Sequence, residues 1–291
     1  MVAKISPLIV IVGETASGKT AAAIELAKKF SGEIICADSR TVYRGMDIGT
    51  AKPSAEEQSR VPHHVINVVE PNELFTAADF KRLANEAIED IYARGKIPIM
   101  VGGTGLYVDS VLFDFQFRPK ADPELRKKLE AMTVIELQEE VRNLGLMMPE
   151  NDKNPRHLMR AIEAGEVIRQ PKEMRPNTLV IGITLPREVL KERIVSRVEQ
   201  MVEHGFTDEV KKLIERYGKD SEALQAPGYR AFSEYLDGTV TIEEAKANFV
   251  RNDLQLAKRQ RTWFKRNKST HWLAHPSNIV DLATTFLNKT T

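Results

Sequence analysis

Apolar runs and helical periodicity alternate along the first hundred residues of this chain. The apolar runs, which predict strands, lie at 8–12, 33–37, 64–69, 97–101 and, much later, 178–184. Stretches with helical spacing of apolar residues lie between them, at about 19–30 and 77–94. Because strands that alternate with helices form βαβ units, this pattern predicts an α/β fold with a parallel sheet that helices cover on both faces.

Residues 116–170 follow a different pattern, with helical spacing and no strand. Asp122-Pro123 is typical of a helix N-cap and first turn, and Asn154-Pro155 opens another helix at 156–164, after one at about 134–144. We therefore expect a small all-helical insertion at 116–170. The core would consist of 1–115 and 171–291. The pattern from 186 onward predicts helices throughout, apart from breaks near Gly218, Pro227-Gly228 and Gly238.

Composition narrows the class of protein. Hydrophobic residues make up 42% of the chain and charged residues 29%, as in ordinary globular domains. The N-terminus has no signal-peptide pattern, and no apolar run approaches the roughly 18 residues of a membrane span. The single cysteine, Cys36, lies in an apolar run and excludes an internal disulfide. We expect a cytoplasmic monomer that does not contact a membrane.

The net charge of +1 is unevenly distributed. Segment 251–268 has one acidic residue, Asp253, and a net charge of +6 over eighteen positions. Its basic residues are Arg251, Lys258, Arg259, Arg261, Lys265, Arg266 and Lys268. A local basic segment on a nearly neutral chain indicates a localised contact with a polyanion.

The segment 13–20 reads GETASGKT and directly follows the first apolar run. This is the G-x-x-x-x-G-K-T pattern of a P-loop, in the required order of strand, turn and helix. Gly13 and Gly18 allow backbone N–H groups to surround a phosphate at the start of a helix. Lys19 would add a positive charge, and the Thr20 hydroxyl suits a Mg²⁺ ligand. The segment predicts binding of a di- or polyphosphate.

Polar residues follow two other predicted strands. Asp38 follows the second strand, at the edge where parallel strands present ligand-binding residues. Its position alone leaves three roles open: a general base, a water-mediated Mg²⁺ ligand or a helix cap. The fourth strand ends in Gly102-Gly103-Thr104 instead of the Asp that often holds Mg²⁺ in P-loop enzymes, which argues against phosphoryl transfer. Arg193 and Arg197 share a helix face, which by itself is typical of a solvated surface.

Together these segments resemble the tRNA dimethylallyltransferases, also called tRNA isopentenyltransferases. The resemblance rests on GETASGKT at 13–20, DSRTVYRGMDIGTAKP at 38–53 and VGGTGLY at 101–107, in this order. Shorter matches are PHH at 62–64, FTAADF at 75–80, NPR at 154–156, QAPGYR at 225–230 and KRQRTWF at 258–264. The resemblance covers about 1–165 and 178–268, and implies a P-loop-like core.

The resemblance implies transfer of a dimethylallyl group from its pyrophosphate ester to the exocyclic amine of the adenosine 3′ of a tRNA anticodon. It implies Asp38 as the base, Thr104 near the amine and the donor, and Lys19 and Arg197 as charge-stabilising catalytic groups. Mg²⁺ on Thr20 would be the cofactor. The residues implied to bind pyrophosphate are Gly13, Thr15, Ala16, Ser17, Gly18, Lys19, Thr20 and Arg197.

The resemblance also implies contacts with the tRNA anticodon stem-loop. The residues concerned are Asp38, Ser39, Arg40, Thr41, Thr104, Arg156, Arg160, Gly228, Tyr229, Arg230, Lys258, Arg259, Arg261 and Trp263. For Trp263 and Phe264, packing in a helix core is an equally open interpretation. The chain has Thr41 where the family usually has Gln, and Glu14 where Pro is common.

Three other functions compete with this interpretation. Prenyl transfer to a free adenine nucleotide would use the same pyrophosphate site, but the basic segment and the helical insertion favour tRNA. A P-loop small-molecule kinase could use Arg193 and Arg197 in a lid, but it leaves the 38–53 and 102–107 segments unexplained. A catalytically silent RNA-binding protein would not require Lys19, Thr20, Asp38 and Thr104 together.

Overall fold

A computed structural model describes residues 5–117, 122–165, 171–274 and 278–290. The chain divides into two compact units, one formed by the residues up to 112 and from 175 onward, the other by 113–174. The expected helical insertion, 116–170, falls within the second unit, whose limits lie a few residues outside those expected.

The larger unit is built on a six-stranded sheet in which every neighbouring pair is parallel. The strand order is β3-β2-β4-β1-β5-β6. The strands are β1 (Leu8–Gly13), β2 (Gly32–Cys36), β3 (His63–His64), β4 (Ile97–Gly102), β5 (Thr178–Ile183) and β6 (Thr270–Leu273). The parallel α/β fold predicted from the sequence is confirmed.

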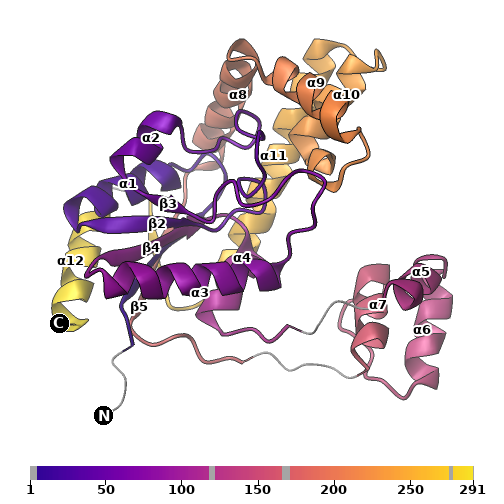
Figure 1. Cartoon of the computed structure of the whole chain (residues 1–291), viewed down its shortest axis with the longest axis horizontal. Coiled ribbons are helices and arrows are strands. Elements are labelled where there is room, and N and C mark those ends of the chain that lie inside the picture. Colours follow the sequence, from indigo (N-terminus) through magenta and orange to yellow (C-terminus); the bar gives the residue numbers. More distant parts are fainter. Residues whose placement is uncertain (1–4, 118–121, 166–170, 275–277, 291) are drawn as a thin grey trace. The chain divides into compact units, whose positions relative to one another are not determined.

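Helices cover both faces of the sheet (Figure 1). Alternate residues of the strands, such as Ile9 and Ile11, form one core with Leu26 of α1 (Lys19–Lys29) and Ala283 of α12 (Ile279–Thr290). On the opposite face lies α3 (Ala77–Ala93), which begins at a capping box formed by Thr76 and Asp79. The buried faces of the central strands explain why their sequences are apolar without alternation.

The long helix α11 (Ile242–Phe264) contacts β1 and the helices α4 (Gly105–Leu112), α8 (Arg187–Glu203) and α10 (Pro227–Leu236). The remaining described helices of this unit are α2 (Ala55–Arg60), which contacts α1, α9 (Phe206–Tyr217), which contacts α8 and α10, and a 3₁₀ turn (Glu222–Gln225), which contacts α10. The 23-residue α11 thus joins the basic segment to the sheet. No helix in the described ranges is both long and apolar enough to cross a membrane.

Two predictions of secondary structure were wrong. The strand expected at 64–69 is reduced to the short β3, because Val65 and Asn67 adopt left-handed backbone angles (φ 58° and 55°) that a strand cannot contain. The region after 186 is not helical throughout, because β6 pairs with β5 there. This four-residue strand, polar at its first two positions, is too short for its periodicity to distinguish it from a helix.

The smaller unit is a three-helix cluster of α5 (Pro123–Glu130), α6 (Val134–Asn143) and α7 (Pro155–Ala164). Each helix begins at a side-chain cap: Asp122, Thr133 and Asn154, respectively. Its core contains Leu129, Leu137, Val141, Leu158, Met159 and Ile162. The apolar spacing read from the sequence therefore corresponds to one shared core.

A phosphate-loop cavity as the candidate active site

The P-loop connects β1 to α1 through a backbone that few sequences allow. Gly13 leaves β1 so close to β5 that a Cβ would lie 2.3 Å from the Ile183 carbonyl oxygen. Ala16 and Gly18 then adopt positive φ angles of 60° and 92°, and α1 begins at Lys19. The Lys19 Nζ donates to the Glu14 carbonyl oxygen at 2.6 Å, which orients the side chain across the loop.

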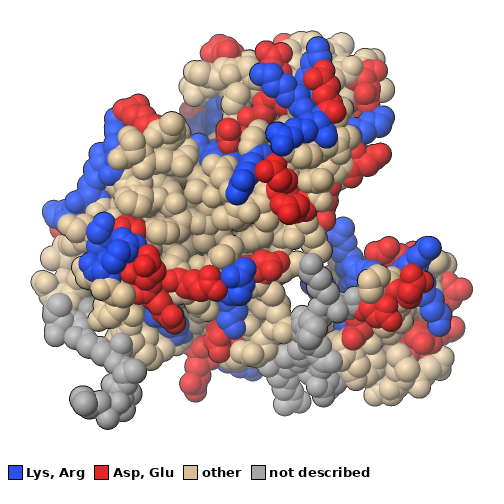
Figure 2. Space-filling view, viewed as in Figure 1, with Lys and Arg blue, Asp and Glu red and all other residues tan. Residues whose placement is uncertain are grey.

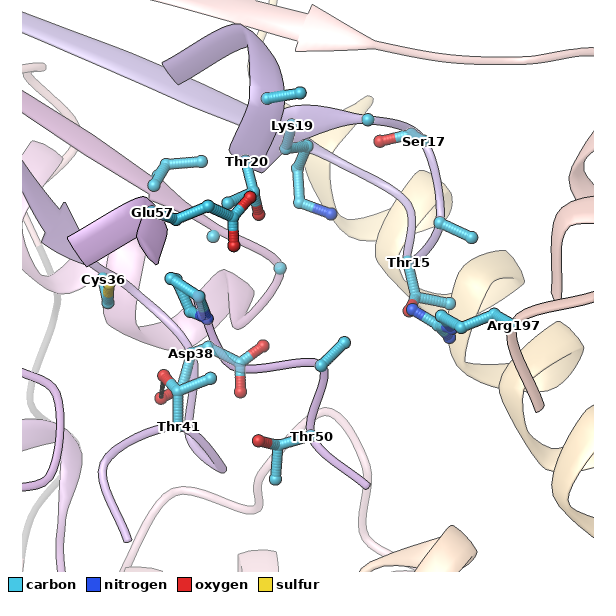
Figure 3. Close-up of a pocket in the computed structure, with 18 of the residues that line it drawn as sticks. Thr15, Ser17, Lys19, Thr20, Cys36, Asp38, Thr41, Thr50, Glu57 and Arg197 are labelled. Carbon is cyan, nitrogen blue, oxygen red and sulfur yellow. Dashed lines mark hydrogen bonds between the residues drawn. The ribbon is translucent and has the colours of Figure 1, made fainter. Parts of the chain in front are cut away.

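This loop lines a cavity of about 440 Å³ in the larger unit. Figure 3 shows Lys19, Asp38 and Arg197 pointing into it from three sides. The predicted residues that line it are Thr15, Ala16, Ser17, Gly18, Lys19, Thr20, Asp38, Thr41 and Arg197. Gly13 is not among the lining residues, and its place in the loop is explained by the close approach to Ile183.

The charge balance of the cavity favours an anion. Burial lowers the pKa of Lys19 to about 8, while Asp38 opposes this shift and Arg197 adds to it. Arg193 is a third cation on the wall, with its Nη1 3.8 Å from the position of a Cβ on Gly18. The sequence placed Arg193 on the helix face of Arg197 without assigning it to the site. Neighbouring cations in a partly buried cavity are stabilised when a polyanion binds.

Arg197 is held by a carboxylate from α11. Its Nη2 donates to Asp253, a residue that is only 6% exposed. Burial raises the pKa of the Asp253 carboxyl group above its usual value, and the Arg197 guanidinium opposes part of this rise. The Arg197 Nε and the Ser17 hydroxyl are buried and have no hydrogen-bond partner among the described residues. Buried polar groups without partners are uncommon in folded proteins. Both groups belong to the predicted pyrophosphate-binding set, and an anion would satisfy both.

Hydrogen bonds join the turn after β2, which carries Asp38, to Thr104 after β4. The Asp38 carboxylate accepts a hydrogen bond from the Arg40 N–H at 2.8 Å, and it faces the cavity. The Thr104 hydroxyl accepts from the Ser39 N–H at 2.9 Å, and the Thr104 N–H donates to Ala37 at 3.2 Å. Thr104 thereby ties the end of β4 to the turn that carries Asp38. No helix begins directly after Asp38 in the described range 5–117, so the helix-cap role is not present, and its carboxylate instead accepts within its own turn. Its exposure to the cavity is compatible with a base.

A family model described as IPP transferase matches residues 41–267 of the chain. This chain belongs to the IPP transferase family. The tRNA dimethylallyltransferase of Halalkalibacterium halodurans is 43% identical over 282 residues, covering 91% of this chain and 90% of that protein. The tRNA dimethylallyltransferase of Anoxybacillus flavithermus is 41% identical over 277 residues, covering 91% and 89%.

Solved structures agree with this family assignment. The full-length tRNA isopentenylpyrophosphate transferase of Bacillus halodurans has a TM-score of 0.77 and 40% identity, with 98% of each chain covered. A eukaryotic dimethylallyltransferase acting on tRNA has a TM-score of 0.84 and 26% identity, covering 98% of this chain and 80% of that one. The resemblance inferred from the motifs is confirmed, and with it the prediction of a prenyl-transferring enzyme.

Two residues predicted for tRNA contact, Gly228 and Tyr229, are buried outside the cavity, unlike the buried Thr41, which lines it. Tyr229 is 1% exposed and donates its hydroxyl to Glu209 at 2.6 Å. Gly228 is also buried, and a Cβ there would lie 2.4 Å from the Phe249 ring. We therefore correct the predicted contact set by removing both. Arg230, the next residue of α10, is exposed and remains in the predicted contact set.

Glu209 is a residue that the sequence analysis missed. Its carboxylate accepts hydrogen bonds from the N–H groups of Asp47, Ile48 and Gly49 at 2.9, 2.8 and 3.0 Å, in addition to the Tyr229 hydroxyl. It anchors part of the 38–53 segment to α9. Because its partners are mainly backbone groups, no sequence pattern could have revealed this role.

The basic segment on α11 contains two kinds of residue. Lys258 and Arg259 are exposed, whereas Arg261 pairs with the buried Glu14 and donates to the Leu185 carbonyl oxygen at 3.0 Å. Trp263 donates its Nε1–H to Asp109 at 2.7 Å. Arg266 lies 3.9 Å over the same indole ring, and Phe264 is buried. Phe264 therefore packs in the helix core, which was one of the two interpretations left open for it.

Two predicted tRNA contacts, Arg156 and Arg160, lie in the helical unit. Arg156 and Arg160 lie four positions apart on α7, both exposed, while Leu158, Met159 and Ile162 form its buried side. On the face shown in Figure 2, acidic and basic side chains are interspersed. The exposed arginines of α7 and α11 are therefore local features and not part of a uniformly basic molecule.

The described residues contain no cluster of three His, Cys, Asp or Glu side chains that could hold a metal ion. His64 pairs with Glu33 at 2.7 Å, and the His63 Nδ1 hydrogen-bonds to the Val61 carbonyl oxygen at 2.7 Å. His63 lines the cavity, and its Nε2 is buried without a hydrogen-bond partner among the described residues. Hard oxygen donors that suit Mg²⁺ do line the cavity, namely the Thr20 hydroxyl and the Asp38 carboxylate.

Proposed function

We propose that this chain transfers the dimethylallyl group of dimethylallyl pyrophosphate to the exocyclic amine of the adenosine 3′ of a tRNA anticodon. The products would be isopentenyladenosine in tRNA and pyrophosphate. The observation that carries this proposal is the convergence of Lys19 and Arg197 with Asp38 in one cavity. A leaving pyrophosphate needs the two cations, and an attacking amine needs the carboxylate.

The cavity can promote both halves of the substitution. The bond between the allylic carbon and the pyrophosphate oxygen breaks as negative charge develops on the leaving group, which Lys19, Arg193 and Arg197 stabilise. The amine nitrogen forms the new bond to that carbon, and one of its protons passes to the Asp38 carboxylate. An arylamine-like nitrogen is a weak nucleophile, so removal of its proton during attack lowers the barrier.

We further propose that Mg²⁺ takes part, with the Thr20 hydroxyl as its protein ligand. The ion prefers oxygen ligands and commonly keeps several waters together with substrate phosphates, so one hydroxyl from the protein is sufficient. When bound, it would neutralise charge on the pyrophosphate oxygens. The Thr20 hydroxyl is suited to this role because it lies in the first turn of α1, within the phosphate-binding wall.

The target base must leave its stack to reach a cavity of this depth. Asp38 and the buried Thr41 line the cavity, and the segment 38–41 would receive the adenosine. Arg156, Arg160, Arg230, Lys258 and Arg259 are exposed and would contact the phosphate backbone of the anticodon stem-loop. A tRNA acceptor is consistent with the predicted cytoplasmic location, and the chain is expected to act as a monomer.

A direct assay tests the proposal. The protein is incubated with Mg²⁺, dimethylallyl pyrophosphate and unmodified tRNA bearing an adenosine 3′ of the anticodon, with AMP as a parallel acceptor. Mass spectrometry of the nucleosides should find isopentenyladenosine in the tRNA. Product on AMP alone would favour the nucleotide-acceptor alternative. Product on neither acceptor would overturn the proposed function, and loss of product with EDTA would support the metal.

A further inference from the structure

Gln260, on α11, is a buried amide that joins two loops of the cavity. Its Oε1 accepts a hydrogen bond from the Thr15 N–H of the P-loop at 2.7 Å. Its Nε2 donates to the Gly103 carbonyl oxygen, just after β4, at 3.1 Å. The residue is 7% exposed, and its two partners lie 245 and 157 positions away in the sequence. Both ends of one amide are therefore used, each on a different wall.

The two loops perform different parts of the proposed reaction. Thr15 belongs to the loop that would hold the pyrophosphate. Gly103 directly precedes Thr104, whose hydroxyl accepts from the Ser39 N–H beside Asp38. The relative position of these walls therefore sets the distance between the leaving group and the base. Misplacement of reacting groups by as little as about 1 Å can cost a large factor in rate.

The fit around this amide is tight. A Cβ on Gly103 would lie 2.2 Å from the Gln260 Nε2, so any larger residue at 103 would displace the amide. An apolar side chain could fill the same volume, but it would leave the Thr15 N–H and the Gly103 carbonyl group without this partner. The choice of a buried amide is therefore explained by the two hydrogen bonds and not by packing alone.

We propose that Gln260 is a positioning residue that holds the pyrophosphate loop and the Asp38–Thr104 turn at the spacing required for prenyl transfer. The inference rests on the proposed function. It assigns to α11 a role inside the catalytic unit, beyond its exposed basic residues. It also predicts that loss of these hydrogen bonds changes the KM for the donor as well as kcat.

Two substitutions separate the two hydrogen bonds. Gln260→Met keeps the length of the side chain and removes both bonds. Gln260→Glu keeps an acceptor for the Thr15 N–H but loses the donor to Gly103 at neutral pH. The matched control is Gln255→Met, a change at an exposed glutamine of the same helix. Steady-state kinetics with dimethylallyl pyrophosphate, affinity for inorganic pyrophosphate and thermal unfolding are measured for all three.

We expect Gln260→Met to raise the KM for dimethylallyl pyrophosphate and the Kd for pyrophosphate by about three- to tenfold, and to lower kcat. Gln260→Glu should lower kcat, and at neutral pH its ionised carboxylate beside the P-loop should also raise KM and Kd, because it repels pyrophosphate. Its kcat should recover partly at lower pH, because a protonated carboxyl group can donate to the Gly103 carbonyl oxygen. Gln255→Met should leave all these constants unchanged.

A purely structural role predicts a different result. Both variants would then lose thermal stability and lower kcat alike, in proportion to the folded fraction, with KM and Kd unchanged. That result, or constants within about twofold of the wild type, would overturn the inference. If the wild type forms no product, the proposed function fails. The pyrophosphate affinities of the variants then test by themselves whether Gln260 positions the pyrophosphate loop.

Gly103→Ala provides an independent check. Its methyl group should displace the same amide and raise the KM as Gln260→Met does. Because both changes act through one hydrogen-bonded group, the double variant should be no worse than the more impaired single variant. Additive losses in the double variant would contradict the inference.

Discussion

Glu14 in the P-loop and Arg261 on α11 form an ion pair, although 247 positions separate them in the sequence. Glu14 is 1% exposed, and its carboxylate lies in the loop that would bind a pyrophosphate. An unpaired carboxylate there would be costly to bury and would repel the ligand. Arg261 neutralises it, and the Thr184 hydroxyl donates to the other Glu14 oxygen at 3.4 Å.

This pair predicts that two neighbouring arginines of α11 have different functions. Arg261→Gln should destabilise the fold by about 1–3 kcal/mol, since it leaves a buried charge unpaired, and should weaken pyrophosphate binding. Arg259→Gln, at an exposed position, should leave stability within about 0.5 kcal/mol of the wild type. It should instead lower tRNA affinity and reduce the salt slope by about one. Urea unfolding and tRNA titrations at several salt concentrations measure these effects.

The sequence alone treated both arginines as tRNA contacts. If Arg261→Gln proved as stable as Arg259→Gln and both weakened tRNA binding alike, the structural role of Arg261 would be wrong. The conservative change Arg261→Lys retains the charge but loses the second donor to the Leu185 carbonyl oxygen. It should fall between the wild type and Arg261→Gln in stability.

Asp38 should be required for chemistry and not for tRNA affinity. Asp38→Ala removes the proton acceptor and should reduce prenyl transfer by at least about 100-fold, as expected for loss of a general base. The Kd for tRNA should change little, because affinity for nucleic acid comes mainly from phosphate contacts. Single-turnover transfer and filter binding measure the two quantities. Turnover near the wild-type rate would show that Asp38 is not the base.

The lowered pKa of Lys19 predicts a pH dependence of donor binding. The ammonium form binds an anion, and it predominates below the pKa of about 8 in the free enzyme. Above this pH, kcat/KM for dimethylallyl pyrophosphate should fall by up to about tenfold per pH unit. At saturating donor, kcat should fall less, because bound pyrophosphate raises the pKa of Lys19. A flat kcat/KM profile to about pH 10 would contradict this assignment.

The pairing of Asp253 with Arg197 predicts an indirect effect on the donor site. Asp253→Asn removes the charge that holds the guanidinium at the cavity, and should raise the KM for dimethylallyl pyrophosphate about three- to tenfold. The matched control is Glu199→Gln. Glu199 also joins α8 to α11, through Lys246 at 2.8 Å, but its side chain is 47% exposed. Equal effects of the two changes would indicate a loss of helix packing instead of a loss of orientation.

The sequence by itself determined the parallel sheet, the P-loop and the family. These signals are local: a buried strand is a short apolar run, and a phosphate loop needs glycines and a lysine at fixed spacing. The same local signals located the helical unit and the cavity residues Lys19, Thr20 and Asp38. Arg197 came from the family resemblance, because four-residue spacing alone is equally typical of a solvated helix face.

Tertiary structure decided which polar residues face the cavity and which support it. Sequence could not separate Arg259 from Arg261, because both lie in one basic segment and only the position of Glu14 distinguishes them. It also placed Tyr229 on the tRNA, whereas the structure buries it against Glu209. Hydrogen bonds and ion pairs between residues of different elements depend on how the helices pack on one another and on the sheet. Local periodicity carries no information about that packing, so the contacts of Gln260 and Asp253 became visible only in the folded chain.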